Sequence, residues 1–169
     1  MTHTPPRAGL ILALIVFMID QAIKYAVTGP LALPQLGQIQ ILPFFNLTWV
    51  QNHGVSMGFF QADGPMMRWG LVAVTAVIAT GVVVWMWKEK RRTDVLALGL
   101  VLGGALGNIV DRVRFGYVVD FADVHIGEFR PFLIFNVADA AITIGVLILL
   151  VRALLLRDPE PETTEKRDA

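Results

Sequence analysis

The sequence predicts an all-α membrane protein with four transmembrane helices and a small β-containing region on one side of the membrane. Two observations support this fold class. Hydrophobic residues make up 55% of the 169 residues and charged residues only 17%, with a mean hydropathy of +0.61, which is more apolar than a soluble domain of this length. Four separate stretches are also apolar over roughly the 17 to 25 residues that a helix needs to cross a bilayer.

The four stretches define the expected helices. We expect them over residues 8–27, 67–87, 95–113 and 132–156. The first should end before Gly29 and Pro30, because both residue types disfavour continuation of a helix. Together the four helices predict one membrane domain over residues 1–157. The remainder, residues 158–169, is rich in Pro, Glu and Thr and is expected to be a disordered cytoplasmic tail.

Residues 28–66 form the longest predicted connection, and we expect this outer loop to contain β-structure. Polar and apolar residues alternate in residues 38–42 and 46–50, which is typical of short strands. The loop also carries exposed aromatic residues, which suggests that it rests on the membrane surface. A small sheet covering one end of the helices is the expected result.

Basic residues predict the orientation of the helices. Lys88, Lys90, Arg91 and Arg92 directly follow the second apolar stretch, and such clusters stay on the cytoplasmic side. Arg7 and the basic residues near the C-terminus agree, so both ends of the chain are expected inside. A cleaved signal peptide is the alternative for the first stretch, because Arg7 precedes a short apolar core. The charged residues that follow this core would be unusual flanks for cleavage.

Ionisable and amide side chains within a membrane domain are costly, so their positions suggest function. Here they gather at the outer ends of the predicted helices and in one short segment between the last two: Asp20, Lys24, Asn108, Asp111, Arg112, Asp120, Asn136 and Asp139. Asp20 and Lys24 lie one helical turn apart and predict a structural pair. Asp111 beside Arg112 is consistent with a second buried pair.

Asp120 and Asp139 have no evident basic partner of their own. Two carboxyl groups held close in a low-dielectric site cannot both ionise, so one keeps a proton while the other stays anionic. This is the state in which two aspartates hydrolyse a peptide bond, with no metal and no cofactor required. On the residues alone, ion-pair scaffolding and a proton pathway remain open alternatives.

Five motifs resemble those of lipoprotein signal peptidase, also called signal peptidase II, in order and spacing. They are DQAIK at residues 20–24, NHG at 52–54, GGALGNIVDR at 103–112, VVDF at 118–121 and FNVAD at 135–139. The resemblance covers nearly all of the chain before the tail. It departs from the family pattern after Gly54, where the family has small residues and then an aromatic residue, whereas this chain has Val55-Ser56-Met57-Gly58.

The resemblance implies an aspartic endopeptidase of the bacterial plasma membrane with its active site at the extracytoplasmic face. Such an enzyme removes the signal peptide from a diacylglyceryl-modified prolipoprotein, cutting before the lipidated cysteine. By motif, Asp120 and Asp139 are the expected catalytic residues. The residues expected to bind substrate or support the site are Asn52, Gly54, Asn108, Asp111, Arg112 and Asn136. The expected partners are lipid-modified precursors and membrane lipids, and the expected state is a monomer.

Other chemistries have weaker support. A net charge of zero gives no basic surface for nucleic acid, and the absence of cysteine removes thiolate nucleophiles and Cys-based metal sites. Ser56 lies in a G-x-S-x-G pattern, but no series of β-α-β units accompanies it. His3, His53 and His125 are widely separated and expected at the surface, so we predict no metal site.

Two further alternatives concern the acids. Asp123 lies three residues after Asp120 but outside the matched motif, and we expect it to be solvated. A small transporter could instead use Asp20, Lys24, Asp111 and Asp139 as a charge pathway. That function would spread polar groups through the membrane, whereas the inner halves of the predicted helices are nearly free of charge. A non-catalytic assembly factor would need neither acid.

Overall fold

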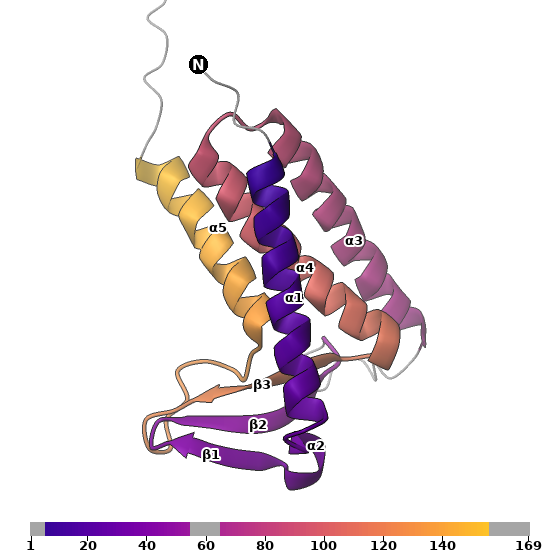
Figure 1. The fold of residues 1–169 in the computed structure, drawn as a ribbon, viewed down its shortest axis with the longest axis vertical. Helices are drawn as coiled ribbons and strands as arrows, with labels where there is room; N and C mark the ends of the chain where they lie inside the picture. The colour runs from indigo at the N-terminus through magenta and orange to yellow at the C-terminus, as the bar shows by residue number, and fades with distance from the viewer. Residues whose placement is uncertain (1–5, 55–64, 156–169) are drawn as a thin grey trace, which may run out of the picture.

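The computed structural model describes residues 6–54 and 65–155, and within these ranges the chain forms a helical bundle covered at one end by a small sheet (Figure 1). The elements in chain order are α1 (Arg7–Thr28), α2 (Leu33–Leu36), β1 (Gln38–Leu42), β2 (Phe45–Asn52), α3 (Pro65–Lys88), α4 (Arg92–Phe115), β3 (Val118–Val124) and α5 (Val137–Leu155). The tail predicted at residues 158–169, and Ser56, lie outside the described residues.

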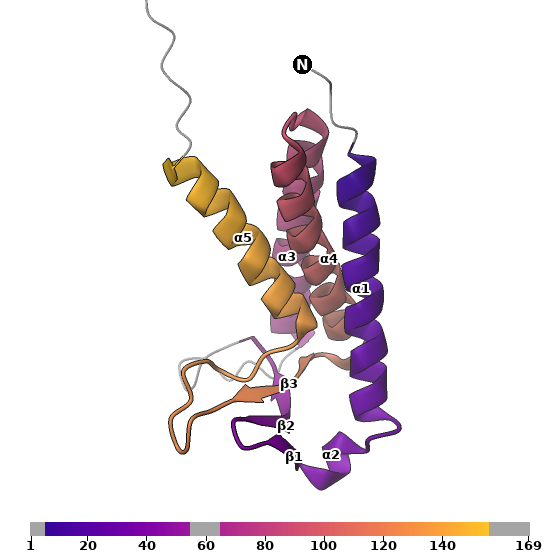
Figure 2. The ribbon, with the colours of Figure 1, turned by 60° about the vertical axis from the view of Figure 1, so that its left-hand side comes forward.

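Among the described residues, four helices are long and apolar enough to cross a membrane: α1, α3, α4 and α5. The predicted fold class is confirmed. Helix α4 is the centre of the bundle, because α1, α3 and α5 each pack against it. The outer three helices expose many large apolar side chains, as helices surrounded by lipid do. Figure 2 shows α5 leaning away from α4 toward its C-terminal end.

Glycines on α4 let its neighbours approach closely. A Cβ atom built at Gly103 would lie 2.5 Å from the backbone oxygen of Ala13 on α1, and one built at Gly99 would lie 2.5 Å from the backbone oxygen of Gly9. On an adjacent face, a Cβ atom at Gly104 would meet the backbone oxygen of Ala138 on α5. Small residues at such contacts allow helix backbones to pack directly in a membrane.

We therefore expect Gly103→Ala to destabilise the protein by about 1 to 3 kcal/mol, because the added methyl group must push α1 away from α4. Thermal unfolding in detergent measures the effect. Gly81→Ala on α3 is the matched control, since a Cβ atom at Gly81 meets nothing within 4 Å. Equal unfolding temperatures for the two variants would show that close packing at Gly103 is not needed.

The sheet has the order β1-β2-β3, and both pairs of strands are antiparallel. Val50 pairs with Asp120 and Asn52 with Val118, so the end of β2 lies beside the start of β3. The inner face of the sheet packs against the end of α1 and against α2, where Val27, Leu33 and Phe121 are buried together. The sheet thus fixes β3 directly beneath the helical bundle.

The last helix begins five residues later than its hydropathy predicts, at Val137 instead of residue 132. Phe135 belongs to an extended segment: its backbone N–H donates to the oxygen of Ala122 at 3.2 Å, and the N–H of Ala122 donates to the oxygen of Phe135 at 2.8 Å. Phe135 therefore adds one bridge to the sheet, and the apolar residues just before it lie in a loop and not in the helix. Hydropathy alone does not separate such a run from the helix that follows it.

Candidate active site

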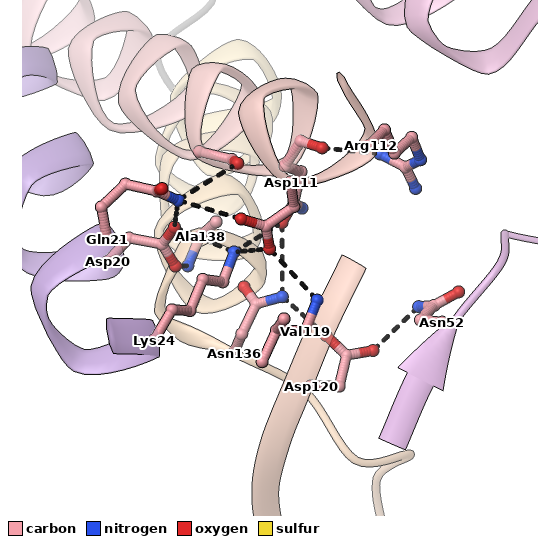
Figure 3. Close-up of polar contacts among 12 residues, drawn as sticks. Asp20, Gln21, Lys24, Asn52, Asp111, Arg112, Val119, Asp120, Asn136 and Ala138 are labelled. Carbon is pink, nitrogen blue, oxygen red and sulfur yellow. Dashed lines mark hydrogen bonds and ion pairs between the residues drawn. The ribbon is translucent and has the colours of Figure 1, made fainter. Parts of the chain in front are cut away.

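Asp120 lies on β3, and amide groups from two other elements hold its carboxyl group. The side chain is buried, with 1% of the residue exposed. Nδ2 of Asn52, from the end of β2, donates to Oδ2 at 2.9 Å, and Nδ2 of Asn136, just before α5, donates to Oδ1 at 2.6 Å. Figure 3 shows Asp120 between these two amides.

Asp139 lies in the first turn of α5 and forms a reciprocal pair with Asn136. The Asn136 side-chain oxygen accepts from the backbone N–H of Asp139 at 2.9 Å, and Oδ2 of Asp139 accepts from the backbone N–H of Asn136 at 3.3 Å. This is the arrangement of a capping box, which satisfies N–H groups at the start of a helix. The capping box fixes Asp139 at the N-terminal end of α5.

Asn108 completes the connection between the two acids. Its Nδ2 donates to Oδ1 of Asp139 at 2.8 Å, and its Oδ1 accepts from Nδ2 of Asn136 at 3.3 Å. The hydrogen bonds therefore run from Asp120 through Asn136 and Asn108 to Asp139. The structure brings together both predicted acids and three of the predicted supporting amides, which come from β2, α4 and the start of α5.

Burial raises the pKa of Asp120 to about 6. The hydrogen bond from Asn52 opposes the shift, the negative charge of Asp139 adds to it, and the hydrogen bond from Asn136 opposes it. A carboxyl group in this environment keeps its proton to a higher pH than a solvated aspartate does. Asp120 therefore exchanges its proton at mildly acidic pH, well above the range of a solvated aspartate.

A buried charge triad lies directly behind this network. Nζ of Lys24 lies 2.9 Å from Oδ2 of Asp20 and 2.7 Å from Oδ2 of Asp111, and only 3% of Lys24 is exposed. Lys24 also donates to Oδ1 of Asn108 at 3.3 Å. Because an ammonium group can only donate, this contact orients the Asn108 amide so that its NH₂ group faces Asp139.

The triad also joins the elements that carry the site (Figure 3). Oδ1 of Asp20 accepts from the backbone N–H of Ala138 at 3.0 Å, and Oδ2 of Asp111 accepts from the backbone N–H of Val119 at 3.1 Å. Gln21 donates to Oδ1 of Asp111 at 3.1 Å. The possible pairing of Asp111 with Arg112 is therefore wrong, because both Asp111 oxygens contact α1 and β3 instead.

Arg112 lies in the last turn of α4, near the end of β2. Its Nε atom is buried without a hydrogen-bond partner among the described residues, and one terminal nitrogen lies 3.5 Å from the backbone oxygen of Asn108. Gly54 lies beside it, since a Cβ atom there would be 3.6 Å from the Arg112 guanidinium group. Gly54 also has φ of +83°, which favours glycine.

Two residues near the site were not predicted from the sequence. Arg68 on α3 donates from Nε to the backbone oxygen of Arg112 at 2.7 Å and from its terminal nitrogen to that of Val113. It thereby caps the end of α4 that carries the site. Gln21, described above, is the other. Both are polar residues within apolar stretches, and that placement was the available signal.

Asp123 was expected to be solvated, and this expectation is wrong. The residue has 0% exposure and accepts hydrogen bonds from Thr48 at 2.9 Å and from Nε of Arg130 at 3.0 Å. Burial would raise the pKa of Asp123, but these two hydrogen bonds hold it below its usual value. Sequence distance from Asp120 could not reveal this pairing, because Arg130 comes from the loop that follows β3.

Comparison with known proteins identifies the family. The Peptidase_A8 family, described as signal peptidase (SPase) II, matches residues 12–155. The chain belongs to the signal peptidase II family. The lipoprotein signal peptidase of Rhizorhabdus wittichii is 61% identical over 94% of this chain and 91% of that protein. The one from Sphingopyxis alaskensis is 58% identical over 95% and 92%.

Solved structures agree with the signal peptidase II assignment. Two chains described as bacterial membrane enzymes match with TM-scores of 0.73 and 0.74 at 31% and 32% identity. They cover 95% and 87% of this chain, and 92% of each solved chain is covered. The family resemblance predicted from the five motifs is confirmed, and with it an aspartic peptidase in place of a serine hydrolase, a transporter or an assembly factor.

Proposed function

We propose that the chain removes signal peptides from lipid-modified prolipoproteins, with Asp120 and Asp139 as its catalytic residues. The observation that carries the proposal is the hydrogen-bond connection between the two carboxyl groups through Asn136 and Asn108. These contacts hold both carboxyl groups at fixed positions in one site, as a pair of catalytic aspartates requires. The names of the related proteins, each a lipoprotein signal peptidase, support the class of substrate.

In this proposal the two acids have different tasks. Asp120 is the more deeply buried and holds the proton, which it donates toward the carbonyl oxygen of the scissile bond. Asp139 accepts hydrogen bonds from two N–H groups. It also lies at a helix N-terminus, a position that suits a carboxylate. It removes a proton from water as the water attacks the carbonyl carbon, and later gives that proton to the leaving nitrogen. As the C–N bond breaks and the carbonyl re-forms, Asp120 takes a proton back from a hydroxyl of the tetrahedral intermediate.

The proposed location is the extracytoplasmic face of a bacterial plasma membrane. The basic cluster from Lys88 to Arg92 lies at the junction of α3 and α4, at the opposite end of the bundle from the sheet (Figure 1). Since basic clusters stay inside, Asp120 and Asp139 face outward. We also propose a monomer, because among the described residues the groups that hydrogen-bond the two acids come from a single chain.

Reconstitution with two precursors tests the function. Purified protein in lipid vesicles should cleave a precursor whose cysteine carries a diacylglyceryl group and should leave the unmodified precursor intact. Mass spectrometry of the products locates the cut. Cleavage of neither precursor would contradict the proposal, and a cut at a position other than before the lipidated cysteine would contradict the assigned specificity.

The pKa of Asp120 predicts the pH dependence. A monoprotonated pair is the active form, and it persists while Asp120 keeps its proton. We therefore expect kcat/KM, which reports the free enzyme, to fall as the pH rises through about 6. Cleavage rates at low substrate concentration, measured across the pH range in one vesicle preparation, give the profile. A kcat/KM that increases through this range and then stays level would contradict the protonated role of Asp120.

A further inference from the structure

The loop between β3 and α5 forms one wall of an apolar pocket beside Asp139. The pocket has a volume of about 330 Å³. Its lining residues are Phe132, Leu133, Phe135, Asp139, Ala140, Thr143 and Ile144. The first three belong to the loop and the others to the first two turns of α5. A mainly apolar pocket with a few polar groups on its wall is the usual form of a site for a small ligand or for part of a substrate.

The loop side chains that form this wall have little packing of their own. Leu133 is 91% exposed and Phe132 is 63% exposed. Their position therefore depends on how the backbone on either side is held. On the C-terminal side, Phe135 is hydrogen-bonded to the backbone of Ala122 in both directions, at 2.8 and 3.2 Å. On the N-terminal side of Phe132 and Leu133, the anchor is a contact between two side chains.

Asp123 and Arg130 supply that anchor. Nε of Arg130 donates to Oδ1 of Asp123 at 3.0 Å, and a terminal nitrogen donates to Oδ2 at 3.4 Å. A two-point contact of this kind fixes direction as well as distance. Because Asp123 is fully buried, the pair is not an ordinary surface ion pair of small effect.

The sheet in turn holds Asp123 in place. Thr48 on β2 donates to Oδ2 of Asp123 at 2.9 Å, and Gln38 on β1 donates to the Thr48 hydroxyl at 3.0 Å. The contacts thus cross all three strands and end on Arg130, two residues before Phe132. We call Asp123 and Arg130 together the loop clamp. Phe132 and Leu133 lie between the clamp and the Phe135 anchor, so both ends of the wall are fixed.

We propose that Asp123 and Arg130 are positioning residues, and that their clamp holds the pocket wall so that the pocket binds one acyl chain of the lipid-modified precursor. This inference rests on the proposed function. The pocket is apolar, it lies at the outer end of the membrane-spanning α5, and Ile144 at its inner edge is exposed toward lipid. An acyl chain that moves from the outer leaflet into the pocket stays in apolar surroundings, so it is not exposed to water.

The test compares precursors that differ only in acyl-chain length. Arg130→Gln removes the clamp without leaving a cavity in the core, because half of the arginine side chain is exposed. For a palmitoyl precursor we expect KM to rise about 4- to 16-fold, which corresponds to one or two methylene groups that the pocket no longer buries. For a butyryl precursor, which does not fill the pocket, KM should stay near the wild-type value. The kcat value should change little for either.

Two further variants separate positioning from general stability. Arg114→Gln removes another exposed arginine on the same side of the membrane and should leave both KM values unchanged. Arg130→Lys keeps the charge but not the two-point contact, so it should restore part of the palmitoyl affinity. If Arg130→Gln unfolds because Asp123 is left charged, the double variant Asp123→Asn/Arg130→Gln removes that charge and is measured instead.

Each other outcome contradicts the inference. An equal KM increase for both chain lengths would show that the pocket does not hold an acyl chain. An unchanged KM, or a fall in kcat alone, would show that the clamp does not position the pocket wall. If wild-type protein cleaves neither precursor, the proposed function fails as well. If wild type cleaves both and Arg130→Gln behaves identically, only the clamp inference fails.

Discussion

Replacing Asp139 with asparagine should lower kcat by about 10³-fold or more while leaving the protein folded in the membrane. The amide has nearly the same shape and can still accept a hydrogen bond from Asn108, but it cannot remove a proton from water. Losing a general base typically lowers the rate 10²- to 10⁴-fold. When two groups act as a unit, removing either one lowers the rate nearly as much as removing both. Single-turnover cleavage of a lipid-modified precursor measures the effect.

Asp120→Asn should lower kcat by a similar factor, because the proposed pair then lacks the carboxyl group that holds the proton. The matched control is Asp94→Asn, which makes the same chemical change at the other end of the bundle, where Asp94 pairs with Arg152. That variant should cleave at the wild-type rate per folded molecule. Normal turnover by either dyad variant, with an unchanged unfolding temperature, would rule out the proposed catalytic pair.

The second large effect is expected at Lys24, where Lys24→Met should destabilise the protein by about 3 to 5 kcal/mol. Asp20 and Asp111 are both fully buried, and removal of the ammonium group leaves two carboxyl groups in the interior without their cation. Thermal unfolding in detergent shows the loss. Lys88→Met, at an exposed position at the end of α3, is the control and should change stability little.

A triple variant distinguishes the charge effect from the loss of side-chain volume. Asp20→Asn and Asp111→Asn, combined with Lys24→Met, remove all three charges and should recover part of the lost stability. No recovery would mean that packing of the lysine stem, and not its charge, stabilises the site. Recovered stability without recovered turnover would fit the third contact of Lys24, which orients the amide of Asn108.

The helices could be predicted from the sequence because each one depends on the residues within its own segment. In lipid, the backbone N–H and C=O groups of an apolar segment must all be hydrogen-bonded within the protein. A single segment achieves this by forming a helix. The start of α5 could not be predicted in the same way, because the hydropathy of Phe135 does not show whether the residue lies in a helix or in an extended segment. The Asn136–Asp139 spacing carried a capping signal, but hydropathy obscured it.

The site was predictable only in part. The motifs predicted Asp120 and Asp139 as the catalytic pair, which stays a prediction, and the positions of the polar residues within the apolar stretches predicted that they gather at one end of the bundle. The partners of Asp111 and Asp123 were not predictable, because they depend on which elements pack together. Lys24 reaches Asp111 from another helix, and Arg130 reaches Asp123 across a turn. Ion pairs between distant segments leave no pattern of spacing in a single sequence.

The capping box at the start of α5 has a consequence for biosynthesis. Asp139 is placed by the first turn of α5, whereas Asp120 is placed by a sheet whose strands come earlier in the chain. A nascent chain with three inserted helices therefore holds one acid without the other. If Asp120 and Asp139 act together as proposed, peptide hydrolysis becomes possible only after α5 has inserted, because a copy without α5 lacks the second acid.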